Sequence, residues 1–112
     1  MILLNDAKVQ LCELLKKRFP KADVVINERR SIILEMRVVF NPKVFMDLYI
    51  NALTGKQSYA LIENGKRLWG YDNYRYWHHH PVEGPANHIS CSEPSFEKIV
   101  NDVQMALAKL GY

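Results

Sequence analysis

Apolar residues near the N-terminus recur at helical spacing and predict a first helix over residues 3–20. Asn5 or Asp6 is the expected N-cap, because a short polar side chain can accept a hydrogen bond from a free backbone N–H group. Pro20 ends the helix, because proline lacks the N–H that the helix needs. The apolar stripe consists of Leu4, Ala7, Leu11, Leu14, Leu15 and Phe19.

A second helical stripe lies at the C-terminal end of the chain. Ser92 or Glu93 is the expected N-cap, and Pro94 suits the first turn, where its missing N–H costs nothing. The stripe consists of Phe96, Ile99, Val100, Val103, Leu107 and Leu110. The chain is therefore expected to end in a helix that covers part of the core.

Between the two helices the apolar spacing changes to two, which is typical of strands with one buried face. Asn64-Gly65 predicts a tight hairpin, because both residues accept a positive φ. The turns are short, so neighbouring strands are expected to be antiparallel. The expected strands lie within residues 22–30, 31–40, 44–51, 58–64 and 67–72.

These elements predict a single α+β domain over residues 1–112. The expected architecture is an antiparallel meander of four to five strands, covered on one face by the N-terminal and C-terminal helices. The opposite face is expected to be open and partly polar, which suits a substrate or a partner. The polar positions expected on it are Glu35, Arg37, Asp47, Tyr49 and Arg67.

Composition narrows the functional classes only moderately. The 112 residues are 48% hydrophobic and 24% charged, which is the profile of a soluble globular domain. No apolar run is long enough for a membrane span, and no secretory signal is found. The two cysteines make no disulfide framework, so we expect a cytoplasmic protein. The net charge of +3 permits an anionic partner.

Residues 70–90 hold all four histidines of the chain, and a metal site is one interpretation of this clustering. On an extended strand His78 and His80 point the same way, and His79 points opposite. With His88 as a third ligand they could bind Zn²⁺, and Asp72 or Cys91 is the candidate fourth ligand. The spacing matches no closed structural-zinc pattern.

A second interpretation is acid–base chemistry without a metal. Two imidazoles can cleave RNA when one takes the proton of the 2′-hydroxyl and the other protonates the leaving oxygen. Arg67 or Arg75 could stabilise the charged phosphate. Aromatic side chains beside the histidines could stack on unpaired bases. The candidates for RNA binding are Arg75, Tyr74, Tyr76 and Trp77, with Tyr71 nearby.

The third interpretation is structural. Pro81, Gly84 and Pro85 predict a stiff loop, and Asp72-Asn73 predicts a turn. In that case the histidines would hold the loop by bonding to its carbonyl groups. The absence of histidine elsewhere in the chain favours function over this interpretation.

The sequence also resembles a known family. The run FMDLYINALTGKQSYALIENGKRLWGYDN, followed by WHHHP, NHIS and EPSFEKIV, is similar to the TumE-like toxin components of prokaryotic toxin–antitoxin systems. The likeness covers about residues 44–100. It implies a small cytoplasmic toxin, an antitoxin partner with a helix-turn-helix, and RNA as the substrate. The matching site positions are Arg67, Asp72, His78, His80 and His88.

Together these patterns favour a toxin-like, metal-independent ribonuclease without a cofactor. His78, His80 and His88 would supply acid and base, Arg67 would stabilise the phosphate, and Asp72 would orient a histidine. The alternative is a non-enzymatic domain that binds Zn²⁺ at the same three histidines, or a partner on the open sheet face. A homodimer is compatible with either hypothesis.

Overall fold

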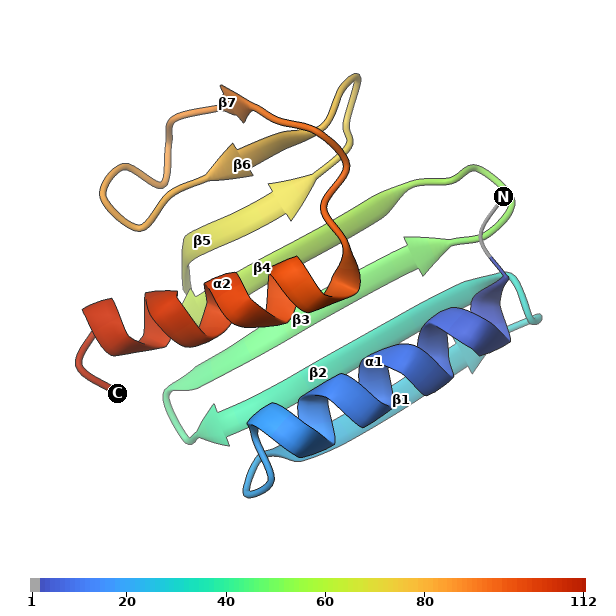
Figure 1. The fold of residues 1–112 in the computed structure, drawn as a ribbon, viewed down its shortest axis with the longest axis horizontal. Helices are drawn as coiled ribbons and strands as arrows, with labels where there is room; N and C mark the ends of the chain where they lie inside the picture. The colour runs from blue at the N-terminus through green and yellow to red at the C-terminus, as the bar shows by residue number, and fades with distance from the viewer. Residues whose placement is uncertain (1–2) are drawn as a thin grey trace.

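Seven antiparallel strands form one sheet, and their order in space is their order in the sequence (Figure 1). The computed structural model describes residues 3–112. The predicted α+β class is confirmed. The helices are α1 (Leu4–Arg18) and α2 (Phe96–Lys109), and the strands are β1 (Asp23–Arg29), β2 (Ile33–Asn41), β3 (Val44–Asn51), β4 (Gln57–Glu63), β5 (Lys66–Asp72), β6 (His78–His80) and β7 (Ile89–Ser90).

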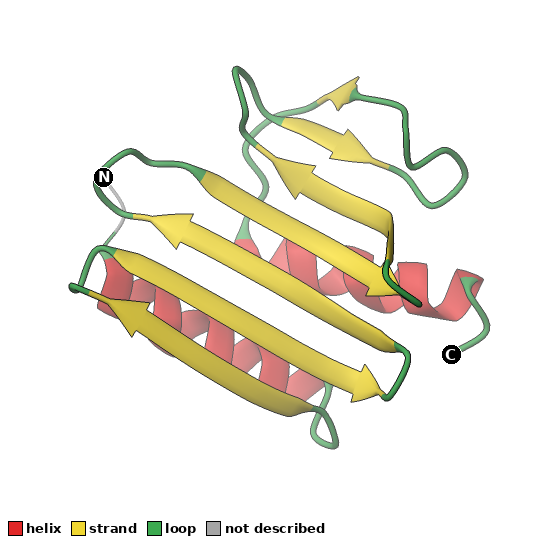
Figure 2. Cartoon of the chain, turned by 180° about the vertical axis from the view of Figure 1, so that it is seen from behind, coloured by secondary structure: helices red, strands yellow, loops and turns green. Residues whose placement is uncertain are grey.

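Both helices cover the same face of the sheet and leave the other face open, as predicted (Figure 2). The helical stripes pack on alternate strand residues, because strand side chains point to opposite faces. None of the helices in the described part of the chain is long and apolar enough to cross a membrane. The fully buried centre includes Leu11, Leu15, Val38, Met46, Ile50, Leu61 and Ile99.

The register of β2 and β3 places four of the five predicted polar residues together on the open face, and the fifth, Arg67, lies on β5. Arg37 is directly opposite Asp47. The guanidinium donates from Nε and Nη2 to the two carboxylate oxygens, at 2.8 and 3.0 Å. It also lies 4.1 Å from the centre of the Phe45 ring. The cross-strand pair therefore satisfies the charge of Arg37 within the sheet.

The hairpin between β4 and β5 confirms the expectation for Asn64-Gly65. Both residues have positive φ, 50° and 80°. This backbone matches the twist of the two strands that it joins.

The sheet is longer than the four to five strands expected from the sequence. Two short strands, β6 and β7, extend it beyond β5. In β6, His78 pairs with Asp72 and His80 pairs with Gly70. These strands lack an alternation of apolar and polar residues, so periodicity alone could not reveal them.

The helix N-termini differ from the predicted caps. Helix α1 begins one residue after Leu3, which makes no side-chain capping bond, so neither Asn5 nor Asp6 is the cap. Leu4 lies inside the helix because it is buried in the core. Helix α2 is capped by Ser95, whose side chain accepts the N–H of Lys98.

Gly70 marks a close contact between strands beneath the histidine segment. A Cβ at this position would lie 2.7 Å from the carbonyl oxygen of Tyr59. Because this oxygen belongs to the backbone of a strand inside the sheet, it cannot shift without distorting the packing around it. We expect Gly70→Ala to lower the free energy of unfolding by about 1–3 kcal/mol, measured by urea denaturation.

The matched control for this prediction is Ser58→Ala on the neighbouring strand, which removes an atom and adds none. Its unfolding midpoint is expected to stay close to that of the wild type. Equal stability of Gly70→Ala and the wild type would contradict the close contact.

Candidate functional site

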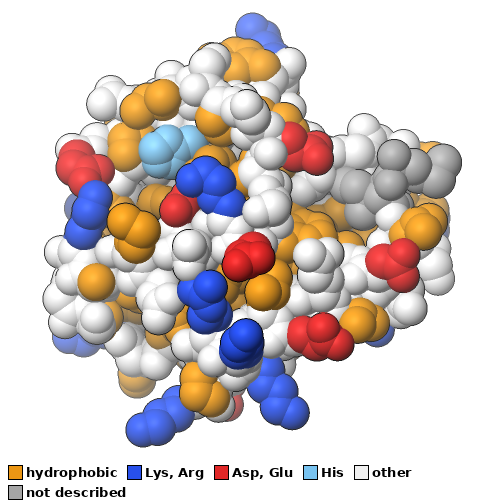
Figure 3. Space-filling view, viewed as in Figure 1, with side chains coloured by type: hydrophobic (Ala, Val, Ile, Leu, Met, Phe, Trp, Pro, Cys, Tyr) orange, Lys and Arg blue, Asp and Glu red, His pale blue; other side chains and the backbone are white. Residues whose placement is uncertain are grey.

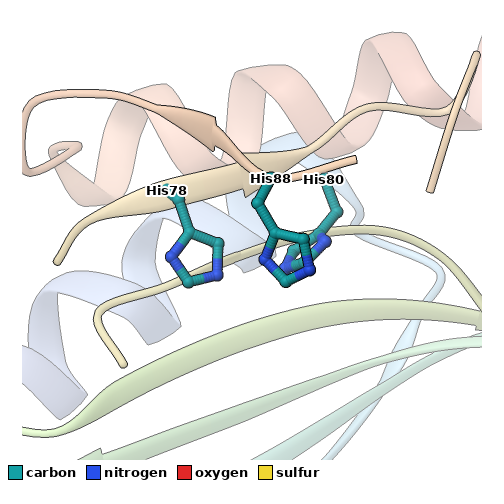
Figure 4. A group of neighbouring side chains, drawn as sticks. All are labelled: His78, His80 and His88. Carbon is teal, nitrogen blue, oxygen red and sulfur yellow. The ribbon is translucent and has the colours of Figure 1, made fainter. Parts of the chain in front are cut away.

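Strand β6 divides the histidine run between the two faces of the sheet. The side chains of His78 and His80 lie on the open face and point the same way (Figure 4). Both are buried, with exposed fractions of 4% and 1%. The alternation predicted for the run is therefore present.

His79 lies on the helix-covered face, away from the other histidines. Its ring stacks on Tyr71, with centroids 5.1 Å apart. It lines a hollow together with Cys91 and residues of α2. Burial raises the pKa of the Cys91 thiol, which keeps it protonated and weakly reactive. Cys91, a candidate fourth metal ligand, is thus on the wrong face for that role.

The ring of His88 lies next to the two buried histidines. The segment 81–88 turns back over β6 and brings the His88 ring to 4.9 Å from His78 and 4.5 Å from His80, measured between centroids. One nitrogen from each of the three rings lies within 4.8 Å of the other two. His88 is exposed, and within residues 3–112 its ring nitrogens have no hydrogen-bond partner.

The carboxylate of Asp72 lies between the two buried rings. Its Oδ1 is 3.1 Å from Nε2 of His78, and its Oδ2 is 3.2 Å from Nε2 of His80. Oδ1 also accepts the backbone N–H of Tyr74 at 3.0 Å. Asp72, which ends β5, thus contacts both histidines predicted to act with it. We call His78, His80, His88 and Asp72 the histidine cluster.

The second nitrogen of each buried ring has a fixed partner as well. Nδ1 of His78 is 3.0 Å from the carbonyl oxygen of Tyr76, and Nδ1 of His80 is 3.1 Å from that of Pro85. A carbonyl oxygen only accepts, so both Nδ1 atoms must carry a hydrogen and donate it. In the neutral form of each ring, Nε2 therefore carries the lone pair, and this atom lies 3.1 Å (His78) and 3.2 Å (His80) from the carboxylate of Asp72.

The environment of His80 favours this neutral form. Its pKa is lowered below the ordinary value, chiefly by burial and then by the charge of Arg67. Burial has this effect because a charged ring loses its hydration when it is removed from water.

A hollow of about 300 Å³ opens over the histidine cluster. Arg67 enters it from β5, and Arg75 from the turn between β5 and β6. Tyr74 and Tyr76 lie on the same turn and are 63% and 51% exposed, so their rings are accessible to a ligand. The lining residues are Arg67, Asp72, Tyr74, Arg75, Tyr76, His78, His80 and His88.

Most of the predicted site residues therefore meet in one place. The exceptions are Trp77, Tyr71 and Cys91. Trp77 packs half-buried against the core, and Tyr71 and Cys91 line the hollow beside α2. The backbone carbonyl of Trp77 accepts the N–H of Cys91, which ties the turn to the segment after β7.

The sequence did not reveal the groups that position the cluster. Asn73 holds the turn after β5: its Oδ1 accepts the N–H of Gln57, and its Nδ2 donates to the carbonyl of Gly55, both at 2.8 Å. The Asp-Asn pair was a turn signal, but these partners lie in another hairpin. The carbonyl groups of Tyr76 and Pro85 carry no sequence signal at all.

A larger hollow, of about 660 Å³, lies on the same open face over β1 to β4. Its lining includes the ion pair of Arg37 and Asp47 but no histidine. Because its arginine is already paired, this surface offers less unsatisfied charge to a ligand. We therefore place the candidate site at the histidine cluster.

Comparison of the chain with family models, with curated proteins and with solved structures gave no significant match. The resemblance to the TumE-like toxins therefore stays a prediction.

Proposed function

We propose that this protein is a toxin-like ribonuclease that binds RNA in the hollow over the histidine cluster and cleaves its phosphodiester backbone there. The observation that carries the proposal is the convergence of three imidazoles and a carboxylate on a hollow lined by two arginines. Such a set offers groups that move protons beside groups that bind phosphate.

The reaction that fits this set is transesterification within RNA. The 2′-oxygen bonds to phosphorus as the bond between phosphorus and the 5′-oxygen breaks. A base in the cluster takes the proton of the 2′-hydroxyl, and the 5′-oxygen receives a proton from a conjugate acid. The products are a 2′,3′-cyclic phosphate and a 5′-hydroxyl. Arg67 would stabilise the extra negative charge on phosphorus.

The rim of the hollow supports a single-stranded substrate. Tyr74 and Tyr76 are exposed next to the cluster, and such rings stack on unpaired bases of any sequence. Arg75 provides a second cation on the same turn. By contrast, the basic and acidic side chains visible on the helix-covered face are interspersed (Figure 3). We therefore propose that RNA approaches from the open face.

The biological setting is proposed from the resemblance given above. A toxin of this kind would act in the cytoplasm and would be held inactive by an antitoxin protein with a helix-turn-helix. The open sheet face, which surrounds the hollow, is where such an inhibitor would block RNA. Co-expression with the product of a neighbouring helix-turn-helix gene should then relieve growth inhibition, and no relief would argue against this setting.

The test of the proposed function is cleavage of a fluorogenic single-stranded RNA by the purified chain. We expect His88→Ala to reduce kcat/KM about 100-fold or more, because one catalytic imidazole typically contributes 10²- to 10⁴-fold. The fold should survive, since His88 is exposed. His79→Ala is the matched control: it removes a ring on the other face and should retain activity.

Two results would contradict the proposal. The first is that the wild-type chain, freed of any inhibitor, cleaves no RNA under any ionic condition tested. The second is that His88→Ala and His79→Ala both cleave at the rate of the wild type, which would place any activity outside the hollow. An oligonucleotide with 2′-O-methyl groups should resist cleavage, because it lacks the attacking hydroxyl.

A further inference from the structure

We infer that the histidine cluster is a binding site for one divalent transition-metal ion, with zinc as the best-matched ion. The ligands would be Nε2 of His78, Nε2 of His80, a carboxylate oxygen of Asp72 and a ring nitrogen of His88. This inference goes beyond the proposed function, because it stands on the contacts among these four residues and does not require RNA as a substrate.

The first argument comes from counting donors and acceptors. Nδ1 of His78 and of His80 must donate to backbone carbonyl groups. In that tautomer Nε2 of each ring carries the lone pair, and it lies 3.1 Å (His78) and 3.2 Å (His80) from a carboxylate oxygen of Asp72. Two acceptors at that distance repel each other. Something positive is therefore needed between the nitrogens and the oxygens.

The three groups lie close enough for one ion to reach all of them. The centroids of the two buried rings are 5.0 Å apart, and the carboxylate of Asp72 contacts both rings. Flipping either ring would place Cδ2 where Nδ1 is now and Cε1 where Nε2 is now. The contacts with the backbone carbonyl group and with Asp72 would then be lost.

One metal ion would accept the lone pairs of both Nε2 atoms and the charge of the carboxylate. The nitrogen–oxygen separations of 3.1 and 3.2 Å are close to those between neighbouring ligands of one ion. The donor atoms of a tetrahedral zinc ion, bound at about 2.0–2.1 Å, lie about 3.3–3.4 Å apart. His88 is exposed, so its ring can turn to complete the set without disturbing the core.

The backbone groups that hydrogen-bond to the proposed ligands are also typical of a metal site. Histidines that bind a metal through one nitrogen usually donate the other N–H to a carbonyl or carboxylate group, which fixes the ring and its tautomer. The carbonyl groups of Tyr76 and Pro85 do this for His78 and His80. The N–H of Tyr74 likewise holds Asp72 in place.

The donor set selects the class of ion. Three imidazoles and one carboxylate suit Zn²⁺ and neighbouring first-row ions, whereas Mg²⁺ and Ca²⁺ prefer oxygen ligands. A chain with this site should therefore discriminate strongly for Zn²⁺ over Mg²⁺.

The test is calorimetric titration of Zn²⁺ into the full chain after removal of bound metal with a chelator. We expect one ion per chain with a Kd below about 1 μM, and no measurable heat from Mg²⁺ at the same concentrations. His88→Ala and Asp72→Asn should each weaken Zn²⁺ binding about 10- to 100-fold or more. Mutation of a residue that only hydrogen-bonds to a metal ligand already has an effect of that size.

His79→Ala is the matched control, because it removes an imidazole from the same strand without touching the cluster. Its Kd for Zn²⁺ should equal that of the wild type. Neither ligand variant is expected to unfold the chain, because His88 is exposed and Asn has the shape of Asp. Circular dichroism should therefore show native spectra for both.

The inference is overturned if the wild type binds no Zn²⁺ in this range, or if His79→Ala weakens binding as much as His88→Ala does. Its failure can be told apart from failure of the proposed function. RNA cleavage without Zn²⁺ binding would remove the metal site alone. Zn²⁺ binding without RNA cleavage would remove the ribonuclease proposal and leave the metal site.

Discussion

Asp72→Asn is expected to reduce RNA cleavage about 10²- to 10⁴-fold while the chain remains folded. The reason is that one carboxylate serves both buried histidines, through contacts of 3.1 and 3.2 Å. Asparagine keeps the shape and still accepts the N–H of Tyr74, but it removes the negative charge and one of the two matching oxygens. Both buried rings therefore lose their common partner in a single substitution.

The measurement is kcat/KM on a single-stranded RNA, with thermal unfolding recorded in parallel. Asp47→Asn is the matched control, because Asp47 is a carboxylate on the same open face that pairs with Arg37 and does not touch the cluster. It should retain most of the activity. If Asp72→Asn cleaves as fast as Asp47→Asn, then the carboxylate between the histidines has no part in the reaction.

Ile99→Ala is expected to lower the free energy of unfolding by about 2–5 kcal/mol. Ile99 lies on the inner face of α2 and is fully buried, so alanine leaves a cavity that the surrounding core cannot fill completely. This loss is a large part of the total stability of a domain of this size, which is about 5–15 kcal/mol. Chemical denaturation monitored by tryptophan fluorescence measures it.

Met105→Ala provides the comparison for that prediction. Met105 lies on the same helix but is 59% exposed, so its truncation removes little buried surface. Its free energy of unfolding should stay within about 0.5 kcal/mol of the wild type. Similar losses for both variants would mean that α2 does not pack on the sheet through the face described here.

The sequence predicted the central part of the fold well because two strands carry a strong period of two. In β2 and β3 every second residue is apolar, so only one face can be buried, and the register that pairs Arg37 with Asp47 follows. The Asn64-Gly65 turn was equally clear, because few other residue pairs accept its backbone.

The edge of the sheet was harder to predict. Strands β6 and β7 have three and two residues, and their pairing depends on the contact of His78 with Asp72 and on the return of segment 81–88. Neither is a local property of the sequence. The helix caps were missed for a similar reason: several polar residues were suitable, and burial of Leu4 decided where α1 begins.

The candidate site was partly visible in the sequence. Alternation along a strand already separated His79 from His78 and His80, and the structure confirms that separation. What could not be inferred was that Asp72 lies between both rings, or that backbone carbonyl groups hold their other nitrogens. Those contacts determine the tautomers of the two buried rings, and the inferred metal site is argued from them.

The most direct test of the whole account is the rate of RNA cleavage by the metal-stripped chain before and after addition of one equivalent of Zn²⁺. We predict cleavage by the stripped chain, because the proposed acid and base are free imidazoles. We predict inhibition when the ion is added, because it occupies the same ring nitrogens, and little cleavage by Asp72→Asn in either state. Cleavage at the same rate with and without Zn²⁺ would contradict the metal-binding cluster as the reactive centre, and no cleavage in either state would contradict the ribonuclease itself.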